Sequence, residues 1–507
     1  MTTQRIVIAG GGTAGWMTAA AMSRFVPKST EITLVESAAI GTVGVGEATI
    51  PPLADFNHML GIDEHTFLAA TGGTYKLGID FLNWGDNGER YFHPFSAFGF
   101  DIEGIGFHQV WHWLQQQQHM PPLDAYTIGA QAAARERFIR PRTDDPRSPL
   151  AQMRHAYHID AGRYATFLRE YAEARGVTRL EGRIQTIEQH PEHGDIVALH
   201  LEQGVVVPGD FFVDCTGFRS LLIGQTLDSE WLDWSHWLPC ARAVAVPSAP
   251  APTLASHTQA TALAAGWQWR IPLQHRTGNG HVYCSALMDE DLATAQLLDH
   301  LATAPTDSPR TLKFKTGRRQ TLWENNCVAI GLSSGFVEPL ESTSIHLIQE
   351  GISKLLALFP GQDDPAPQRH EYNQLMARLY DDIRDFVILH YTVNHRQDSP
   401  FWQQLATMAL PDSLNERIDR FTPRGQWFAH RADLFTETSW VAVMMGPGLH
   451  PQGHRTLLGA LERDTLANQF SDMAQVYQEA SAHMPPHAAY INKFCAASDN
   501  AYLEHQR

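Results

Sequence analysis

The chain is poor in cysteine, and the few cysteines that it has are far apart. Its 507 residues include Cys215, Cys240, Cys284, Cys327 and Cys495. No two of them have the Cys-x-x-Cys spacing of zinc sites or thioredoxin-type centres. Because their number is odd and their spacing wide, a disulfide framework is disfavoured, and we expect buried free thiols.

The sequence also lacks long apolar runs and an excess of positive charge. It contains no run of about 18 apolar residues, the length that spans a bilayer. The 55 acidic residues outnumber the 38 basic ones, and the net charge of −17 disfavours nucleic acid and membrane surfaces as partners. A hydrophobic fraction of 43% is typical of a globular enzyme. We therefore expect a small-molecule partner and, because a strand begins at Arg5 without a signal peptide, a cytoplasmic location.

What the chain does contain is a dinucleotide-binding pattern near its N-terminus. An apolar run at 5–9 and a helix-forming stretch at 13–25 are followed by a second apolar run at 31–36, which predicts a βαβ unit. The turn between the first two carries Gly10-x-Gly12-x-x-Gly15, and Glu36 closes the second strand. These glycines allow a pyrophosphate to approach backbone N–H groups, and the acid suits a ribose hydroxyl. The pattern leaves NAD and FAD open.

Further strands and a helical C-terminal part complete the expected α/β architecture. The segments 210–217 and 327–331 are apolar strands that end at glycine. The segment 210–217 favours FAD as the dinucleotide, and the alternative is that it is an ordinary core strand. Weak alternation between 180 and 207 predicts an antiparallel hairpin and hence a mixed sheet. We expect an FAD-binding module at 1–365, with a substrate-side insertion at about 85–150. A mostly helical substrate-side region follows at 366–507.

A tryptophan-rich string is the most unusual feature of the sequence. Trp267 and Trp269 stand two residues apart, so they lie on one face of a strand that ends near Pro272. The pair is either a wall that excludes water from a reactive centre or ordinary core packing. His108 and His112 stand one helical turn apart without the glutamate of a zinc-protease motif, and we expect no metal.

Five strings together resemble the flavin-dependent tryptophan halogenase family. They are GGGTAGW at 10–16, GVGEATIP at 44–51, GGTYKLGIDF around Lys76, WQWRIP at 267–272 and SSGFVEPLESTSIHLI at 333–348. They occur in order over roughly residues 1–350. The resemblance implies a flavoprotein monooxygenase-type fold and includes the family's signature of Trp267, Trp269, Ile271 and Pro272.

The resemblance implies a two-component enzyme. A separate flavin reductase supplies reduced FAD, which reacts with oxygen and with chloride or bromide to give hypohalous acid. Lys76 matches the lysine that holds this oxidant, and Glu341 matches the second catalytic residue. An ammonium group can polarise the halogen, and a carboxylate can stabilise the ring cation and accept its proton. The alternatives are an aromatic monooxygenase on the same fold and a catalytically silent flavin-binding protein.

The resemblance also assigns binding residues. The cofactor residues are Gly10, Gly12, Thr13, Ala14, Gly15, Trp16, Glu36, Ala48, Leu332 and Ile345. Thr343 and Ser344 match the halide site, where Ser344 departs from the family's common glycine.

On the substrate side the resemblance assigns a loop at His93, Pro94 and Phe95, together with Trp440. The stretch 434–448 lacks the tyrosine pair that holds the amino-acid head of free tryptophan. We therefore expect an indole-type aromatic substrate, and a monomer or homodimer.

Overall fold

A six-stranded sheet in the order β20-β21-β12-β1-β2-β8 organises the N-terminal half of the protein. In this computed structural model, residues 4–39, 46–142, 144–360, 365–429 and 433–497 are described. The strands are β1 (Arg5–Ala9), β2 (Glu31–Glu36), β8 (Thr178–Glu181), β12 (Phe211–Asp214), β20 (Trp323–Glu324) and β21 (Cys327–Ala329). Neighbours run parallel except β20, which is antiparallel to β21. The carboxyl ends of β1, β2 and β12 therefore meet at one edge, where ligands bind in such sheets.

These strands confirm the expected βαβ unit and the mixed sheet. Helix α1 (Thr13–Phe25) connects β1 to β2 as predicted. The antiparallel hairpin expected between 180 and 207 is β9 (Ile184–Gln189) and β10 (Ile196–Leu201). Together with β11 (Val206–Pro208) it forms a sheet of its own, so the antiparallel strand of the main sheet is β20 instead.

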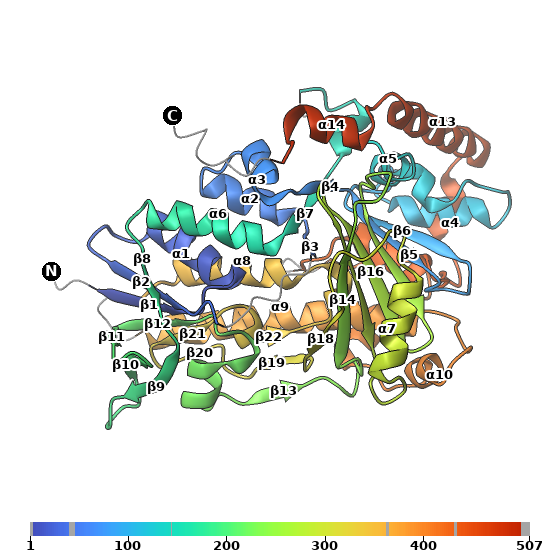
Figure 1. Cartoon of the computed structure of the whole chain (residues 1–507). Helices are drawn as coiled ribbons and strands as arrows, with labels where there is room; N and C mark the ends of the chain where they lie inside the picture. The colour runs from blue at the N-terminus through green and yellow to red at the C-terminus, as the bar shows by residue number, and fades with distance from the viewer. Residues whose placement is uncertain (1–3, 40–45, 143, 361–364, 430–432, 498–507) are drawn as a thin grey trace.

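A seven-stranded sheet in the order β18-β14-β17-β16-β15-β5-β6 lies beside the first one (Figure 1). Its strands are β5 (Gly78–Leu82), β6 (Arg90–Pro94), β14 (Arg242–Ser248), β15 (Thr258–Leu263), β16 (Gly266–Pro272), β17 (Thr277–Tyr283) and β18 (Arg310–Lys313). All pairs are antiparallel except β5 with β15. The tryptophan-rich string is thus a central strand with neighbours on both sides.

Two small sheets join the larger ones. One is β13 (Trp231–Asp233), β19 (Gly317–Arg319) and β22 (Gly335–Phe336). The other is β3 (Gly46–Ala48), β7 (Ala156–Asp160) and β4 (Thr74–Lys76). In the second sheet His158 of β7 faces Ala48 on one side and Thr74 on the other. The strand that ends at Lys76 is thereby fixed beside the segment that follows Ala48.

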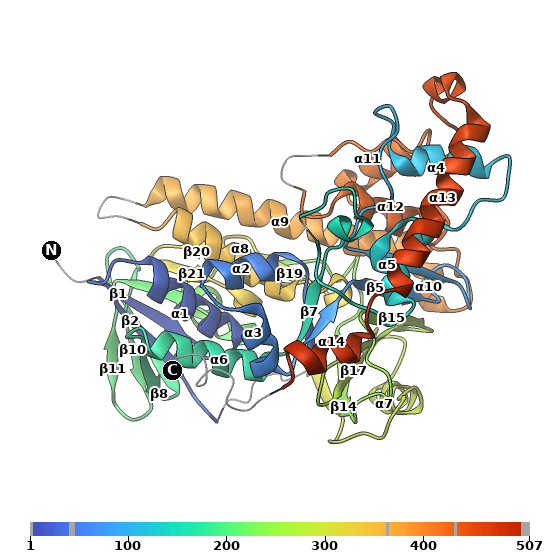
Figure 2. The ribbon, with the colours of Figure 1, turned by 90° about the horizontal axis from the view of Figure 1, so that it is seen from above.

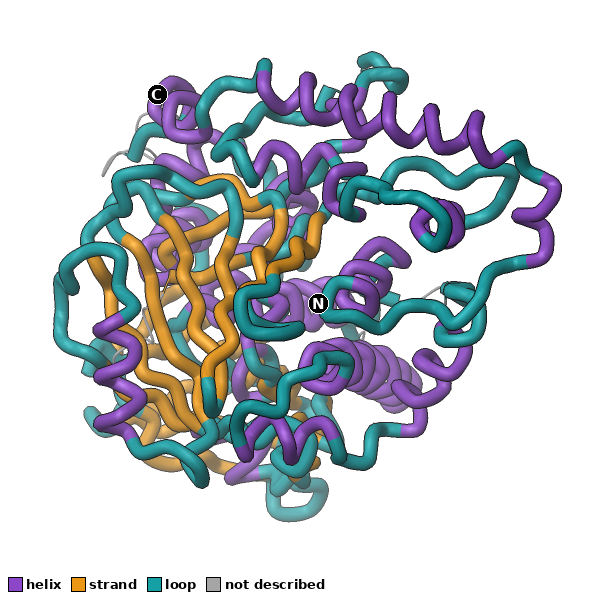
Figure 3. The backbone as a smooth tube through the Cα atoms, turned by 90° about the vertical axis from the view of Figure 1, so that its right-hand side faces the viewer, coloured by secondary structure: helices purple, strands orange, loops and turns teal. Residues whose placement is uncertain are grey.

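Fourteen α-helices in the described residues surround these sheets. The first eight are α1, α2 (Pro52–Met59), α3 (Glu64–Thr71), α4 (Phe107–Gln115), α5 (Ile128–Ala133), α6 (Ala161–Glu173), α7 (Glu290–Asp299) and α8 (Ser344–Ala357). The other six are α9 (Ala366–Thr392), α10 (Pro400–Ala406), α11 (Asp412–Phe421), α12 (Glu437–Met445), α13 (Arg463–Ala482) and α14 (His487–Phe494). Viewed toward the seven-stranded sheet, the strands occupy one side and helices the other (Figure 3). No helix among the described residues is long and apolar enough to cross a membrane.

Helix α9 is the element that links the two halves. It runs along the six-stranded sheet toward α10 and α12 (Figure 2). Near its start Tyr372 packs on Trp323 of β20, and near its end Phe386 packs on Trp440 of α12. Both sheets and α9 contribute to one continuous apolar core. The helical character predicted after residue 366 is confirmed, while the division into two regions near 365 stays a prediction.

Candidate active site

The turn between β1 and α1 forms a cradle that requires glycine. Gly10 has a φ of +108°, and a Cβ atom there would lie 2.2 Å from the carbonyl oxygen of Cys215. A Cβ atom on Gly15 would lie 1.8 Å from the carbonyl oxygen of Gly10, so α1 packs directly on the turn. Gly12 has no atom within 4 Å of its Cβ position, and the first turn of α1 has no acidic residue. Free space beside an uncompensated helix N-terminus fits the pyrophosphate of a dinucleotide.

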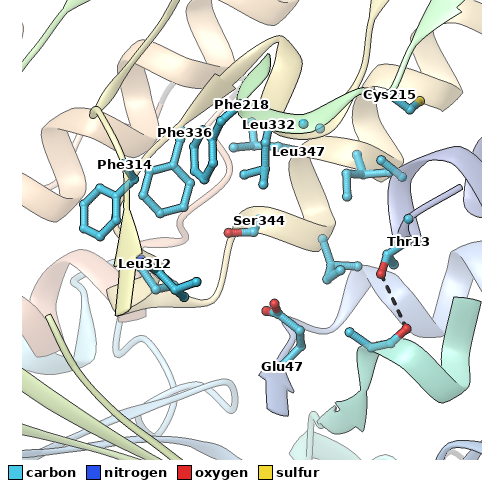
Figure 4. A pocket seen from close by; sticks show the side chains of 18 of the residues that line it. Thr13, Glu47, Cys215, Phe218, Leu312, Phe314, Leu332, Phe336, Ser344 and Leu347 are labelled. Carbon is cyan, nitrogen blue, oxygen red and sulfur yellow. Dashed lines mark hydrogen bonds between the residues drawn. The ribbon is translucent and has the colours of Figure 1, made fainter. Parts of the chain in front are cut away.

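The cradle opens into a cavity of about 560 Å³ between the two large sheets. The expected cofactor and halide residues that line it are Gly10, Gly12, Thr13, Ala14, Glu36, Ala48, Leu332, Ser344 and Ile345. Phe218, Phe336 and Phe314 stand in a row along one side, while Glu47 also faces the space (Figure 4). A flavin dinucleotide needs backbone donors for its phosphates and apolar walls for its ring, and this lining offers both.

Three expected residues are buried but are not part of the cavity lining: Gly15, Trp16 and Thr343. The indole N–H of Trp16 donates to Glu36 Oε2 at 3.3 Å, and Arg179 donates to the other carboxylate oxygen. Trp16 therefore orients an acid that lines the cavity. The string GVGEATIP is described only from Gly46, because 44 and 45 lie outside the described residues.

The signature tryptophans form one wall of the cavity. Trp267, Trp269 and Ile271 are alternate residues of β16 and all line it, which confirms that the two indoles share a face. On the neighbouring strand β17, a Cβ atom on Gly280 would lie 2.0 Å from the Trp269 ring. Pro272 ends the strand. The Trp269 indole is therefore packed against a glycine of β17, which has no side chain to displace it.

Lys76 is completely buried at the end of β4. Its Nζ donates to the carbonyl oxygen of Thr49 at 3.0 Å and to Ser342 Oγ at 2.8 Å, and it lies 5.2 Å from the centre of the Phe95 ring. Burial lowers the pKa of Lys76 to about 7, although the negative charge of Glu341 opposes this. Ser342 also lines the cavity. A single hydroxyl thus lies between the amine and the cofactor space.

Glu341 is buried and held by two histidines. His93 Nδ1 lies 3.0 Å from Oε2, and His390 Nε2 lies 2.7 Å from Oε1. His390 Nδ1 lies 2.9 Å from the carbonyl oxygen of Phe386, which can only accept, so Nδ1 carries a proton. Burial alone would raise the pKa of Glu341, but the histidines outweigh it and lower the pKa to about 2. Glu341 is therefore a carboxylate, and a ring nitrogen of each histidine lies against it.

The turn that leads from Glu341 into α8 is shaped to receive an anion. Ser342 has a φ of +60°, Thr343 is right-handed, and α8 begins at Ser344 with no acid in its first turn. A left-handed residue followed by a right-handed one directs successive N–H groups to one side. The Thr343 hydroxyl is buried with no hydrogen-bond partner among the described residues. The halide role of Thr343 and Ser344 stays a prediction that this geometry fits.

The prediction that residues 93–95 form a loop on the substrate side is wrong for two of the three residues. His93 and Pro94 are the last residues of the edge strand β6, paired with Ile79 and Gly78 of β5, and only Phe95 follows the strand. Pro94 is tolerated there because an edge strand need not donate at its end. The strand fixes the direction of His93 toward Glu341.

Aromatic side chains surround this acid on the substrate side. The Phe386 ring lies 5.8 Å from the His93 ring and 4.9 Å from Trp440. Trp440 is fully buried in α12 and stacks on Trp427 at 5.0 Å. Its indole N–H has no partner among the described residues. The predicted substrate residues His93 and Trp440 are thus joined through one aromatic ring.

The remaining histidine and cysteine patterns are structural. His108 Nε2 lies 2.6 Å from the carbonyl oxygen of Gly425, and His112 Nε2 lies 2.9 Å from that of Pro451. Across the described part of the chain, no three His, Cys, Asp or Glu side chains are grouped to hold a metal ion. The five cysteines are buried free thiols.

The sequence matches the tryptophan halogenase family over residues 5–463. The chain belongs to this family. The halogenase is 36% identical over 471 residues to tryptophan 6-halogenase SttH of Streptomyces toxytricini, covering 88% of this chain and 89% of that protein. A flavin-dependent halogenase from Xanthomonas campestris is 44% identical, with a TM-score of 0.94 over 98% of this chain and 99% of the other. A flavin-dependent halogenase from Brevundimonas sp. BAL3 is 44% identical, with a TM-score of 0.93 over 97% and 99%.

Membership fixes the general chemistry of the halogenase. It is an FAD-dependent enzyme that halogenates a small aromatic substrate and depends on a separate flavin reductase. The α/β fold expected from the sequence is confirmed by these structures. The cavity with its glycine cradle gives the chain a site that fits the flavin.

Sequence reasoning missed several residues of this site. His390 pairs with Glu341, Ser342 bonds Lys76, and Glu338 accepts from the signature indole of Trp267. Ser342 and Glu338 lie within the matched string at 333–348, so their proximity to Glu341 was a usable signal. His390 lies about 50 residues further along, and its position in a regular helix gave no sign of its role.

Proposed function

We propose that the protein halogenates an indole-type ring with hypohalous acid held by Lys76, using bromide faster than chloride. One observation carries this proposal: a buried amine and a buried carboxylate lie beside the cofactor cavity, joined to it through Ser342. When bound, reduced FAD would supply two electrons that, with two more from the halide, reduce oxygen to hypohalous acid and water. The chain's own residues then direct the oxidant to the ring.

Lys76 is proposed to orient the oxidant. Its Nζ donates to two protein oxygens, so one N–H remains to donate to the oxygen of hypohalous acid. Such a hydrogen bond draws electrons from the halogen and makes it more electrophilic. Because the amine is buried next to Ser342, an oxidant formed in the cavity meets it before bulk water.

Glu341 is proposed to stabilise the positively charged ring and to accept its proton. A carboxylate with a pKa near 2 is a weak base, but a protonated aromatic ring is a strong acid, so a weak base suffices. His93 and His390 keep the carboxylate ionised and fix both of its oxygens. The charge then acts at low dielectric, where it is worth most.

The substrate proposal rests on the apolar character of α12. Trp440, Met444 and Met445 are buried on this helix, where an amino-acid head would need charged partners. Burying a zwitterion without such partners is costly. We therefore favour an indole without an amino-acid head over free tryptophan.

One assay tests the whole proposal. Indole and tryptophan are supplied separately with a flavin reductase, NADH, FAD and equal bromide and chloride, and products are read by mass spectrometry. We expect brominated indole to dominate, with a higher kcat/KM for indole than for tryptophan. A tryptophan preference of about tenfold, or ~1.4 kcal/mol, would mean that a clamp for the amino-acid head exists. Hydroxylated product made without halide would identify a monooxygenase instead.

A further inference from the structure

A second carboxyl group, Glu338, is buried three residues before Glu341. It is fully inaccessible, and the turn Pro339–Glu341 follows it directly. Glu338 is the residue before this turn and Glu341 is its last residue. Both carboxyl groups meet the last turns of α9, where Tyr391 donates to Glu338 and the adjacent His390 contacts Glu341. One helix therefore contacts both acids through consecutive residues.

The hydrogen bonds of Glu338 are unevenly divided between its two oxygens. Oε2 accepts from the Trp267 indole N–H at 3.1 Å and from the Tyr391 hydroxyl at 2.6 Å. Oε1 has no partner among the described residues. Since two donors occupy Oε2, a proton on this group would sit on Oε1. Burial raises the pKa of Glu338 to about 7, although the two hydrogen bonds oppose this.

Trp267 connects Glu338 to the cofactor cavity. Trp267 lines the cavity, as do Val337 and Pro339 on either side of Glu338. The indole N–H therefore points away from the cavity into the protein, where Glu338 holds it. The other titratable groups facing this carboxyl are Tyr391 and the buried thiol of Cys240. No cationic side chain among the described residues forms an ion pair with it, so its contacts are those of a positioning group.

We propose that Glu338 is a positioning residue that links Trp267, in the wall of the cavity, to Tyr391 of α9. In this way it fixes the position of the cavity wall relative to the Glu341–His390 pair. A shift of α9 that moved Tyr391 would also move His390, because the two are consecutive. Glu338 thereby couples the place where the oxidant forms to the place where it reacts. The proposal rests on the function proposed above for Glu341 and extends it to a residue that touches neither substrate nor flavin.

The test compares two replacements of Glu338. Glu338→Gln keeps an oxygen that accepts both donors and mimics the neutral acid, whereas Glu338→Met keeps the length but accepts nothing. The readouts are the FAD dissociation constant, the halogenated indole formed per oxygen consumed with bromide present, and the melting temperature. We expect Met to weaken FAD binding and to lower product per oxygen, each at least fivefold. Gln should stay within about twofold of wild type, a difference of ~0.4 kcal/mol.

Tyr391→Phe removes one donor to Glu338 and should lower product per oxygen two- to threefold. The matched control is Tyr372→Phe, a fully buried tyrosine of the same helix whose hydroxyl has no partner among the described residues, and it should change nothing. Adding Tyr391→Phe to Glu338→Met should cause no further loss, because Tyr391 acts through Glu338. The FAD constant is measured without substrate, so it tests the proposal even if wild type leaves indole unhalogenated.

Three results would overturn the proposal. The first is a Met variant that binds FAD and couples oxygen like wild type, and the second is a Gln variant as impaired as Met. The third is a Tyr391→Phe effect that persists in full beside Glu338→Met. If Met does not fold, Glu338→Leu, which also accepts no hydrogen bond, takes its place in the comparison with Tyr391→Phe.

Discussion

The two halves of the halogenase site are built from different parts of the polypeptide. Around the phosphate cradle the backbone forms the surface, with glycines at positions where a Cβ atom would strike the chain or fill the cavity. Around Lys76 and Glu341 the surface is made of buried ionisable side chains contributed by strands β4 and β6, the turn before α8, and α9. The cradle offers backbone N–H groups at a helix N-terminus to an anion, whereas the catalytic half holds charges at low dielectric. Binding and reactivity should therefore be separable by mutation.

The largest separation is expected at Lys76. Lys76→Ala should lower halogenation by ~10³-fold or more, because it removes the N–H groups proposed to donate to the oxidant. FAD affinity should stay within twofold, since Lys76 is not part of the cavity lining. Mass spectrometry of the product measures the loss of halogenation, and a fluorescence titration with FAD measures the affinity. If the purified variant keeps most of its halogenation, the assigned role is wrong.

The same division explains how much the sequence could reveal. The cradle is local: Gly10, Gly12 and Gly15 lie within six residues, and together with the apolar run before them and the helix-forming stretch after them they predicted the strand, turn and helix that form. Lys76 and Glu341 became recognisable through family strings, because a single lysine or glutamate carries no pattern. His390 could not be found in this way, since only the folding of α9 brings it to Glu341. His93 was found through the family resemblance, which assigned it to a loop, whereas the structure places it in the edge strand β6.

A second prediction concerns how the two acids of the turn respond to pH. The pKa of Glu338 is raised from 4.5 to about 7 by burial, so between these values the folded state keeps a proton that the unfolded chain has lost. Stability should fall across this window, by up to ~3 kcal/mol relative to Glu338→Gln. Glu341, whose pKa is lowered to about 2, titrates below the window. Urea unfolding of both proteins at pH 5 and pH 7.5 measures the difference, and parallel stabilities would show that Glu338 is already ionised.

Glu341→Gln tests whether the ionised acid is needed for the chemistry. Gln keeps the shape but removes the charge and the proton acceptor, so turnover should fall ~10²-fold. FAD binding should be unchanged, because Glu341 faces His93 and His390 rather than the cradle. Single-turnover rates with indole provide the measurement. A loss below about threefold would make Glu341 a structural acid.

Gly12→Ala perturbs the other half alone. Its Cβ atom would meet no protein atom within 4 Å, so the fold should be kept at a cost below ~1 kcal/mol. The methyl group would instead occupy the cavity that Gly12 lines, and we expect FAD binding to weaken ~10-fold, or ~1.4 kcal/mol. Gly10→Ala is the contrasting variant, because its Cβ atom would lie 2.2 Å from the carbonyl oxygen of Cys215 and should destabilise the fold. Unchanged FAD affinity in Gly12→Ala would mean that the phosphates bind elsewhere.

The smallest effect is expected at Ser344, where the cavity meets the turn before α8. Bromide sheds water more easily than chloride and is oxidised more readily. Bromination should therefore be faster than chlorination in wild type, with or without a contribution from Ser344. Ser344 adds a hydroxyl to the first turn of α8, beside the N–H groups that would receive the ion. Chloride depends more on close, well-aimed donors, so Ser344→Gly should raise chlorination relative to bromination about threefold, with FAD affinity unchanged. Initial rates at equal halide concentrations give the ratio. A ratio within twofold of wild type, below ~0.4 kcal/mol, would assign the preference to the halides themselves.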